Sequence, residues 1–449
     1  MSADHGEVLD FPFRQVYKVA TTKDDKDTPM QTKASHRPPR QLALWHVGSV
    51  LAALMAFASI STDFYLPAMP EMAKDLAAAP GQIELTITGY LVGISLGQLV
   101  WGPLSDGIGR RLPIALGIVL FLIGSAGCGL SADVTSIILW RVVQAVGAAA
   151  SIVLSRAMVR DLYEGNRAAQ VMSLLMAVMT IAPLVAPSVG AQIVSLWGWR
   201  MIFAMLVLIG LVTLAALFTL PETLPRALPR ARSVRQQSGA PDALVPSGPA
   251  SGVIAAFAGY GRLLRNRPVM AHALVCGFYY VGMFAYVAGS PFVFIDYHHL
   301  SPSLYGLIFS ACVVSITLGN IVNARLVVRI GRLKSLQIGG AGACLFGAIL
   351  ALTTFSDLGG AWGVFLPLLG FVSCTGLILP NALSGALESS TNDAGAISAL
   401  CGAIQYGGGI FGSGLVGLCA DGTAWPLGLV LAGAGAGALI FSQLLARRG

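Results

Sequence analysis

The chain has 449 residues, of which 55% are hydrophobic and only 11% are charged, and its mean hydropathy is +0.74. Soluble domains carry roughly 25% charged residues, so this composition excludes an ordinary soluble domain and indicates an integral membrane protein. The formal net charge of +7 does not indicate a nucleic-acid partner, because the basic residues are spread over many short polar segments.

The first 41 residues are polar and contain no apolar core of the kind that a cleaved signal peptide needs. They predict a disordered cytoplasmic tail over residues 1–41. Met30 lies within this tail and is an alternative start of translation.

Twelve apolar runs follow the tail, each near the ~20 residues with which a helix crosses a bilayer. Their approximate bounds are 42–67, 83–104, 112–130, 134–158, 168–194, 199–220, 270–295, 305–326, 336–355, 362–383, 394–418 and 425–445. We therefore predict an all-α integral membrane protein with twelve transmembrane helices.

A segment rich in Pro, Ser, Gly and Arg separates the sixth run from the seventh, over residues 221–268. This composition predicts a cytoplasmic linker between two six-helix halves, which span residues 42–220 and 269–446. An internal repeat supports the division, because an offset of 222 places Gly97 on Gly319.

Lys and Arg residues gather in alternate polar segments. One set holds the Lys and Arg residues of the tail, the arginine pair at 110–111, the residues 156–167, the linker, the residues 325–334 and the carboxyl end, whereas the other set contains only Lys74 and Arg200. Because cytoplasmic loops of membrane proteins carry an excess of Lys and Arg, both termini are predicted to be cytoplasmic.

The run GQLVWGPLSDGIGRR, at residues 97–111, predicts a tight turn at the membrane surface. Its glycines permit backbone conformations that a Cβ forbids, and its arginines face anionic lipid headgroups. The spacing G-x-x-x-D-x-x-G-R-R resembles the signature between helices 2 and 3 of the major facilitator superfamily; a membrane hairpin of another kind with positive flanks is the alternative. The candidate gating residues in this turn are Gly102, Asp106, Gly109, Arg110 and Arg111.

Further motifs narrow this resemblance. They are STDFYLPAMP at 61–70, LWRVVQAVGA at 139–148, APLVAPSVG at 182–190, WRMIF at 199–203 and MFAYVAGSPFVF at 283–294. From about residue 42 to 440 the chain resembles the bicyclomycin-resistance (Bcr/CflA) group of twelve-helix drug:proton antiporters. The motif at 182–190 is similar to a signature of exporters, which implies a part in gating for Pro183, Pro187 and Gly190.

The resemblance also implies the major facilitator fold, in which two six-helix pseudo-repeats enclose the substrate site near the membrane midplane. No Gly-Lys dipeptide occurs, so the chain has no phosphate-binding loop for ATP. We expect a proton gradient to drive transport without a bound cofactor. The seven cysteines form no C-x-x-C pair and predict neither a metal site nor a disulfide framework.

Three ionisable residues near the predicted outer surface are candidates for proton coupling: Asp63, Arg141 and Glu84. A charged side chain inside a span costs about 2.5 to 3.5 kcal/mol, so Asp63 is expected to face a partner or a water-filled cavity. The resemblance implies that Arg141 sets the proton affinity of a nearby acid. The alternatives are an interfacial acid for Asp63, an arginine bonded to backbone carbonyls for Arg141, and a helix amino-terminal acid for Glu84.

Aromatic side chains on the seventh span predict an apolar substrate pocket. Tyr279, Met283 and Tyr286 follow the spacing i, i+4, i+7 and therefore share one helix face, although a lipid-facing stripe would have the same spacing. The full set of candidate pocket residues is Tyr65, Tyr90, Gln144, Tyr279, Met283 and Tyr286.

These observations predict proton-coupled efflux of drugs or antibiotics across the bacterial inner membrane by alternating access. The expected partners are a small amphipathic substrate, protons and membrane lipids, with no nucleic acid, and the expected state is a monomer. Export of an endogenous metabolite, such as an amino acid or a siderophore, and export specific to phenicols stay open as alternatives. An enzyme is not expected, because motifs such as H-E-x-x-H do not occur.

Overall fold

The computed structural model describes residues 44–163, 165–220, 222, 261–389 and 394–446. The predicted tail and nearly all of the predicted linker lie outside these residues, so both stay predictions. The side chain of Asp106 also lies outside the described part of the structure.

The described residues form helices and connecting turns, and twelve of their helical spans are long and apolar enough to cross a membrane. The first six spans consist of α1 (Leu44–Asp63) with η1 (Leu66–Ala68) and α2 (Met69–Asp75), α3 (Pro80–Ile108), α4 (Arg111–Leu130), α5 (Val134–Leu162), α6 (Gly165–Trp197) and α7 (Arg200–Leu217). The last six consist of α10 (Arg267–Pro291) with η2 (Phe292–Tyr297), α11 (Pro302–Ile330), α12 (Arg332–Ser356), α13 (Gly360–Ser373) with α14 (Thr375–Glu388), α15 (Ala394–Cys419) and α16 (Trp425–Ala446). The predicted twelve-helix fold class is confirmed.

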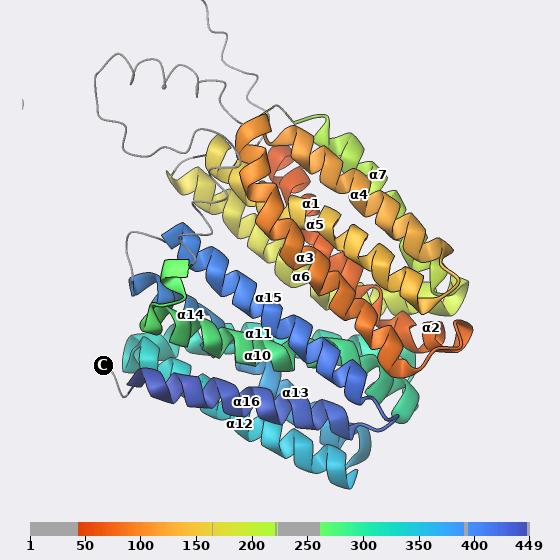
Figure 1. Ribbon diagram of the computed structural model, residues 1–449, viewed down its shortest axis with the longest axis vertical. Coiled ribbons are helices and arrows are strands. Elements are labelled where there is room, and N and C mark those ends of the chain that lie inside the picture. The colour runs from red at the N-terminus through yellow and green to blue at the C-terminus, as the bar shows by residue number, and fades with distance from the viewer. Residues whose placement is uncertain (1–43, 164, 221, 223–260, 390–393, 447–449) are drawn as a thin grey trace, which may run out of the picture. The chain divides into compact units, whose positions relative to one another are not determined.

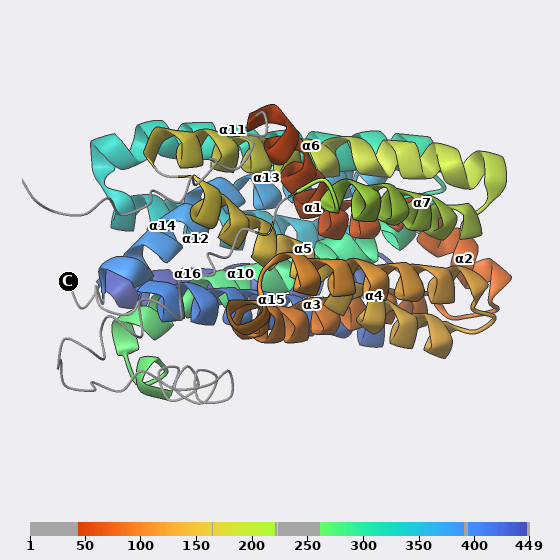
Figure 2. The same ribbon diagram turned by 90° about the horizontal axis from the view of Figure 1, so that it is seen from above.

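The helices pack as two groups of six spans, α1–α7 and α10–α16 (Figures 1 and 2). Two helix pairs form most of the contact between the groups: α3 with α15, and α6 with α11. Both pairs lie in the membrane-spanning part of the fold.

Polar side chains cap the amino-terminal ends of several helices. The Asp133 carboxylate accepts a hydrogen bond from the Ser136 amide at 2.8 Å and so caps α5. Hydrogen bonds from the Ser136 side chain and amide also lower the pKa of Asp133. At the start of α10, Asn266 accepts from the Val269 amide at 3.3 Å. These caps satisfy amide groups that have no partner inside the helix.

Prolines shape the ends of two spans. The first predicted run extends to residue 67, but α1 ends at Asp63 and a 3₁₀ turn follows, because Pro67 has no amide hydrogen with which to continue the helix. The seventh span changes at Pro291 from α-helix to a π-helical turn, Phe292–Tyr297. Asp63 is thereby the last residue of an α-helix within the first membrane span.

The two ends of the bundle differ in how closely the halves approach. We name them the Arg110 end, which carries the turn between α3 and α4, and the Lys74 end, which carries the turns after α2 and η2. At the Lys74 end, Lys74 Nζ lies 3.3 Å from an Asp296 carboxylate oxygen of the other half. A Cβ on Gly81 would overlap the carbonyl oxygen of Gly417. The ribbons of the two halves converge toward this end (Figure 1), which is therefore closed.

Candidate functional site

Arg141 is a fully buried cation in the middle of the amino-terminal half. Its Nη1 donates hydrogen bonds to the Ser61 carbonyl oxygen at 3.0 Å and to Gln144 Oε1 at 2.7 Å. The guanidinium carbon also lies 4.5 Å from the ring centre of Tyr65 and 4.3 Å from that of Tyr90. A cation against an aromatic face gains about 2 kcal/mol when both are desolvated, so the two rings offset part of the cost of burial.

Arg141 nevertheless keeps unused donors. Its Nε and Nη2 are buried and have no hydrogen-bond partner among the described residues. A carboxylate is the usual bidentate partner of a guanidinium, and no described carboxylate is paired with this one. The site therefore holds a buried positive charge with two unsatisfied donor groups.

Asp63 lies two residues after Ser61, whose carbonyl oxygen accepts a hydrogen bond from Arg141, and no ion pair joins Asp63 to Arg141 among the described residues. Its side chain is 7% exposed, and no hydrogen bond or ion pair of its carboxyl is found within the described residues. The hydroxyl groups of Tyr90, Tyr286 and Tyr305 are within electrostatic range of the Asp63 carboxyl. Because Tyr286 and Tyr305 belong to α10 and α11, Asp63 lies where the two halves face each other.

The polar side chains around Arg141 form a buried hydrogen-bonded group. Tyr65 bonds Thr86 at 2.6 Å, the Tyr90 hydroxyl bonds Ser61 at 2.5 Å, and Gln144 Nε2 donates to Ser125 Oγ at 2.8 Å. The structure thus places three of the predicted pocket residues, Tyr65, Tyr90 and Gln144, around Arg141. They hold the guanidinium in this conformation and line no open cavity.

The three predicted pocket residues of α10 separate into two environments. Tyr279 is buried inside its own half, where its ring stacks on Phe371 at 5.2 Å and its hydroxyl donates to the Phe371 carbonyl oxygen at 2.9 Å. Met283 is partly exposed and lies near Thr375. Tyr286 reaches the neighbourhood of Asp63 at the junction of the halves. Tyr279 therefore supports the helix break between α13 and α14, and Tyr286 is the better pocket candidate.

At the Arg110 end, Arg110 connects three helices. Its Nε lies 2.9 Å from an Asp161 carboxylate oxygen at the end of α5, and its Nη1 donates to Ser105 Oγ at 2.6 Å. The sequence analysis did not identify Asp161 as a partner of Arg110. Asp161 could have been identified as an acid in the last turn of the fourth span, because that helix ends at the same membrane surface as the turn that carries Arg110.

Glu222 is a second acid that sequence reasoning missed. Its carboxylate accepts the backbone amides of Arg110 at 2.8 Å and Arg111 at 3.1 Å, at the amino terminus of α4, where a negative charge is favoured. Gly109, beside this carboxylate, has a φ of 98°, which favours glycine. Gly102 differs, since a Cβ there would meet no atom within 4 Å, and it is not a close-packing position in this conformation.

The motif at 182–190 lies on α6, against the end of α1. Pro183 and Pro187 are both inside α6, and a Cβ on Gly190 would overlap the carbonyl oxygen of Phe64. Phe64 directly follows Asp63, so the motif contacts the backbone that positions the Asp63 carboxyl. A shift of α6 would therefore move the surroundings of Asp63.

Glu84 occupies a separate position, on α3 at the Lys74 end. It is 3% exposed and lies beside Gly417 of α15, without a hydrogen bond or ion pair to Asp63 or Arg141. The structure therefore links Arg141 to the backbone just before Asp63 and places Glu84 at the closed contact between the halves.

Metal chemistry has no evident place in the described part of the fold. Among those residues, no three His, Cys, Asp or Glu side chains are arranged to hold an ion. The cysteines are free thiols, and most of them are buried in the apolar spans. They act as small packing residues.

Comparisons with known proteins agree with this architecture. The family model of the Major Facilitator Superfamily matches residues 51–413. The chain is 34% identical over 385 residues to the uncharacterized MFS-type transporter YdgK of Bacillus subtilis strain 168, covering 85% of this chain and 90% of that protein. It is 31% identical over 379 residues to the bicyclomycin resistance protein homolog of Haemophilus influenzae, covering 84% of this chain and 90% of that protein.

A solved structure gives the same fold. The xylose transporter XylE from E. coli, in a partially occluded inward open conformation, superposes with a TM-score of 0.67 at 16% identity, covering 90% of this chain and 97% of that one. This likeness supports the arrangement of the helices alone. Together with the matched family model and relatives, it confirms the resemblance predicted from the motifs: the chain belongs to the Major Facilitator Superfamily, is similar within it to the bicyclomycin-resistance group, and is a multi-pass membrane transporter rather than an enzyme.

Proposed function

We propose that this transporter exports small amphipathic, drug-like molecules across the bacterial inner membrane in exchange for protons, by alternating access. The bicyclomycin resistance protein homolog supports drug export by its name. The excess of Lys and Arg at the Arg110 end supports a cytoplasmic position for that end and for both termini. The closed Lys74 end then faces the outside.

The observation that carries the proposal is a buried acid, Asp63, and a buried arginine with unused donors, Arg141, which are not paired with each other. Arg141 Nη1 is bonded to the carbonyl oxygen of Ser61, two residues before Asp63. Asp63 itself has no cationic partner among the described residues, and an isolated buried carboxylate is costly. In our proposal, Asp63 therefore carries a proton in this conformation.

In our proposal, the proton-release step of the cycle depends on the unused donors of Arg141. A small rearrangement at the end of α1 would bring the Asp63 carboxyl to the free Nε and Nη2 groups. A cation at that distance favours the ionised carboxylate, so formation of the pair would release the proton. Breaking the pair would restore proton uptake. Pro67 and the adjoining 3₁₀ turn supply the backbone freedom, because they already interrupt the helix there.

The substrate would bind between the halves, where Tyr286 of α10 lies near Asp63 and Met283 stands three residues before Tyr286 on the same helix. Tyr286 stacks on Phe309 at 5.5 Å and Met283 is partly exposed. Aromatic and thioether surfaces suit bulky apolar compounds of varied shape. Proton binding at Asp63 and substrate binding would then compete, because both take place in this region.

Accumulation of a compound panel in a pump-deficient host tests this function. The panel should include bicyclomycin, phenicols, cationic dyes, amino acids and siderophores, each with and without a protonophore. We expect lower accumulation of several amphipathic drugs in expressing cells and complete loss of this difference with the protonophore. Export that persists in protonophore-treated cells containing ATP would contradict proton coupling.

A further inference from the structure

Glu84 is buried at the point where the two halves touch at the Lys74 end. Its Oε2 has no contact with solvent and no hydrogen-bond partner among the described residues. A Cβ on Gly417 would lie 3.3 Å from Glu84 Cβ and 3.6 Å from Oε2, so α15 covers the carboxyl directly. A helix amino-terminal acid would use this oxygen to accept an amide hydrogen, and Glu84 does not.

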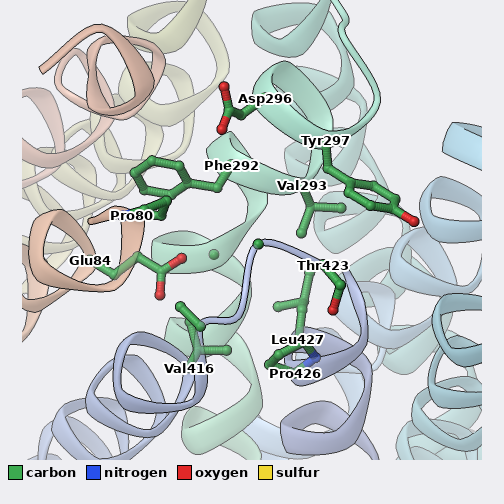
Figure 3. A pocket seen from close by; sticks show the side chains of 13 residues that line it. Pro80, Glu84, Phe292, Val293, Asp296, Tyr297, Val416, Thr423, Pro426 and Leu427 are labelled. Carbon is green, nitrogen blue, oxygen red and sulfur yellow. The ribbon is translucent and has the colours of Figure 1, made fainter. Parts of the chain in front are cut away.

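The carboxyl borders a small pocket formed by both halves (Figure 3). The pocket has a volume of about 40 Å³, which is enough for water and far too small for a drug. Figure 3 shows Glu84 extending from one half toward Phe292 and Val416 of the other, with Asp296 beyond Phe292. The pocket therefore has room for water but not for a drug-sized substrate.

None of the side chains around this pocket supplies a positive charge. The titratable residues that line it are Glu84, from α3, and Asp296 and Tyr297, from η2. The lining segments of α15, α16 and the turn between them contribute Thr423 and apolar residues. Lys74 of α2, which is not among the lining residues, is paired with Asp296 and its side chain is 74% exposed. An ionised Glu84 would have no compensating partner, whereas the neutral acid avoids this penalty.

We propose that Glu84 is a proton-operated latch, which is protonated when the Lys74 end closes and ionised when that end opens. Separation of α3 from α15 would place the carboxyl in water, where a glutamate is ordinarily ionised at neutral pH. The proton then leaves to water on the Lys74 side, and closure takes it back from the same side. Because closure binds a proton, acid on that side favours the closed end.

This inference deepens the proposed function and rests on it for its place in the cycle. Outside acid would close the Lys74 end after drug release and return the carrier to the state that loads drug. The latch is distinct from the exchanged proton at Asp63, since the two acids have no contact. The test of the latch measures conformation and does not depend on transport, so the latch and the proposed function can fail separately.

The experiment measures the distance between spin labels on purified, full-length protein in lipid nanodiscs from pH 5 to pH 9. Labels at Ala132→Cys and Leu358→Cys report on the Lys74 end, because both positions are exposed there, in turns of opposite halves. The background carries Cys344→Ser and Cys419→Ser, since the other native cysteines are buried. In the wild-type background, the closed population should increase on acidification, by up to about tenfold per pH unit for each proton bound.

Glu84→Gln mimics the protonated acid at constant size and should lower this pH slope by about one proton while leaving the end mostly closed. Glu71→Gln is the matched control, an exposed acid on α2 in the same half, and should keep the wild-type profile. Asp63→Asn should keep the slope that depends on Glu84 even where it abolishes transport. Equal slopes in wild type and Glu84→Gln would overturn the latch.

Discussion

Arg141 shows at the scale of single residues what sequence patterns can and cannot provide. An arginine inside a predicted span was sufficient to identify a candidate, because its burial needs compensation. The sequence could not indicate that the compensation comes from two aromatic faces and a backbone carbonyl. Tyr65 and Tyr90 are 76 and 51 positions away in the chain, and only tertiary packing brings them to the guanidinium. The bond to a backbone carbonyl agrees with the structural alternative for Arg141, and its part in proton coupling stays a prediction.

Arg141→Lys tests whether the shape of the cation matters as well as its charge. Lysine keeps the positive charge, but it loses the planar guanidinium that contacts both rings and the fixed set of five N–H donors. We expect at least about tenfold slower drug–proton exchange in proteoliposomes, at normal expression and thermal stability. Arg160→Lys, at an exposed position of the same helix, should exchange at the wild-type rate. Full exchange by Arg141→Lys would show that charge alone suffices.

At the scale of helices, hydrophobic runs and prolines predicted most of the spans, and the exceptions have identifiable causes. The shortened α1 follows from Pro67, and the π-helical turn follows Pro291, both visible in the sequence. The break between α13 and α14 was not predicted. There the Tyr279 hydroxyl, from α10, bonds the carbonyl oxygens of Phe371 and Val372. A helix break that is stabilised by a side chain on another helix leaves no local pattern.

Gly81→Ala tests whether close contact of α3 and α15 closes the Lys74 end. The added methyl would overlap the Gly417 carbonyl, and overpacking of this kind costs about 1 to 3 kcal/mol. We expect the closed population to fall about tenfold, measured as slower cross-linking of Lys74→Cys to Asp296→Cys. Gly433→Ala on α16 is the control, since its methyl would meet no atom within 4 Å. Unchanged cross-linking in Gly81→Ala would mean that other contacts hold this end closed.

For the molecule as a whole, composition and motif spacing predicted the membrane class, the twelve spans and the family. They did so because burial in lipid demands long apolar helices whatever the function. The position of Glu84 could not be predicted, since it depends on how α15 of one half lies on α3 of the other. Candidate gating residues were found as sequence motifs, whereas their partners Asp161 and Glu222 appear only once the helix ends are brought together. The tail and the linker stay predictions.

Drug-driven proton movement in proteoliposomes tests the central claim most directly. Purified wild-type protein and Asp63→Asn would be reconstituted with a pH-sensitive dye inside, and an exported drug would be added with no other energy source. We predict proton movement opposite to the drug in wild type, uphill drug accumulation under an imposed pH gradient, and neither in Asp63→Asn, although that variant still binds drug. Proton exchange and drug accumulation at wild-type rates in Asp63→Asn would contradict the account.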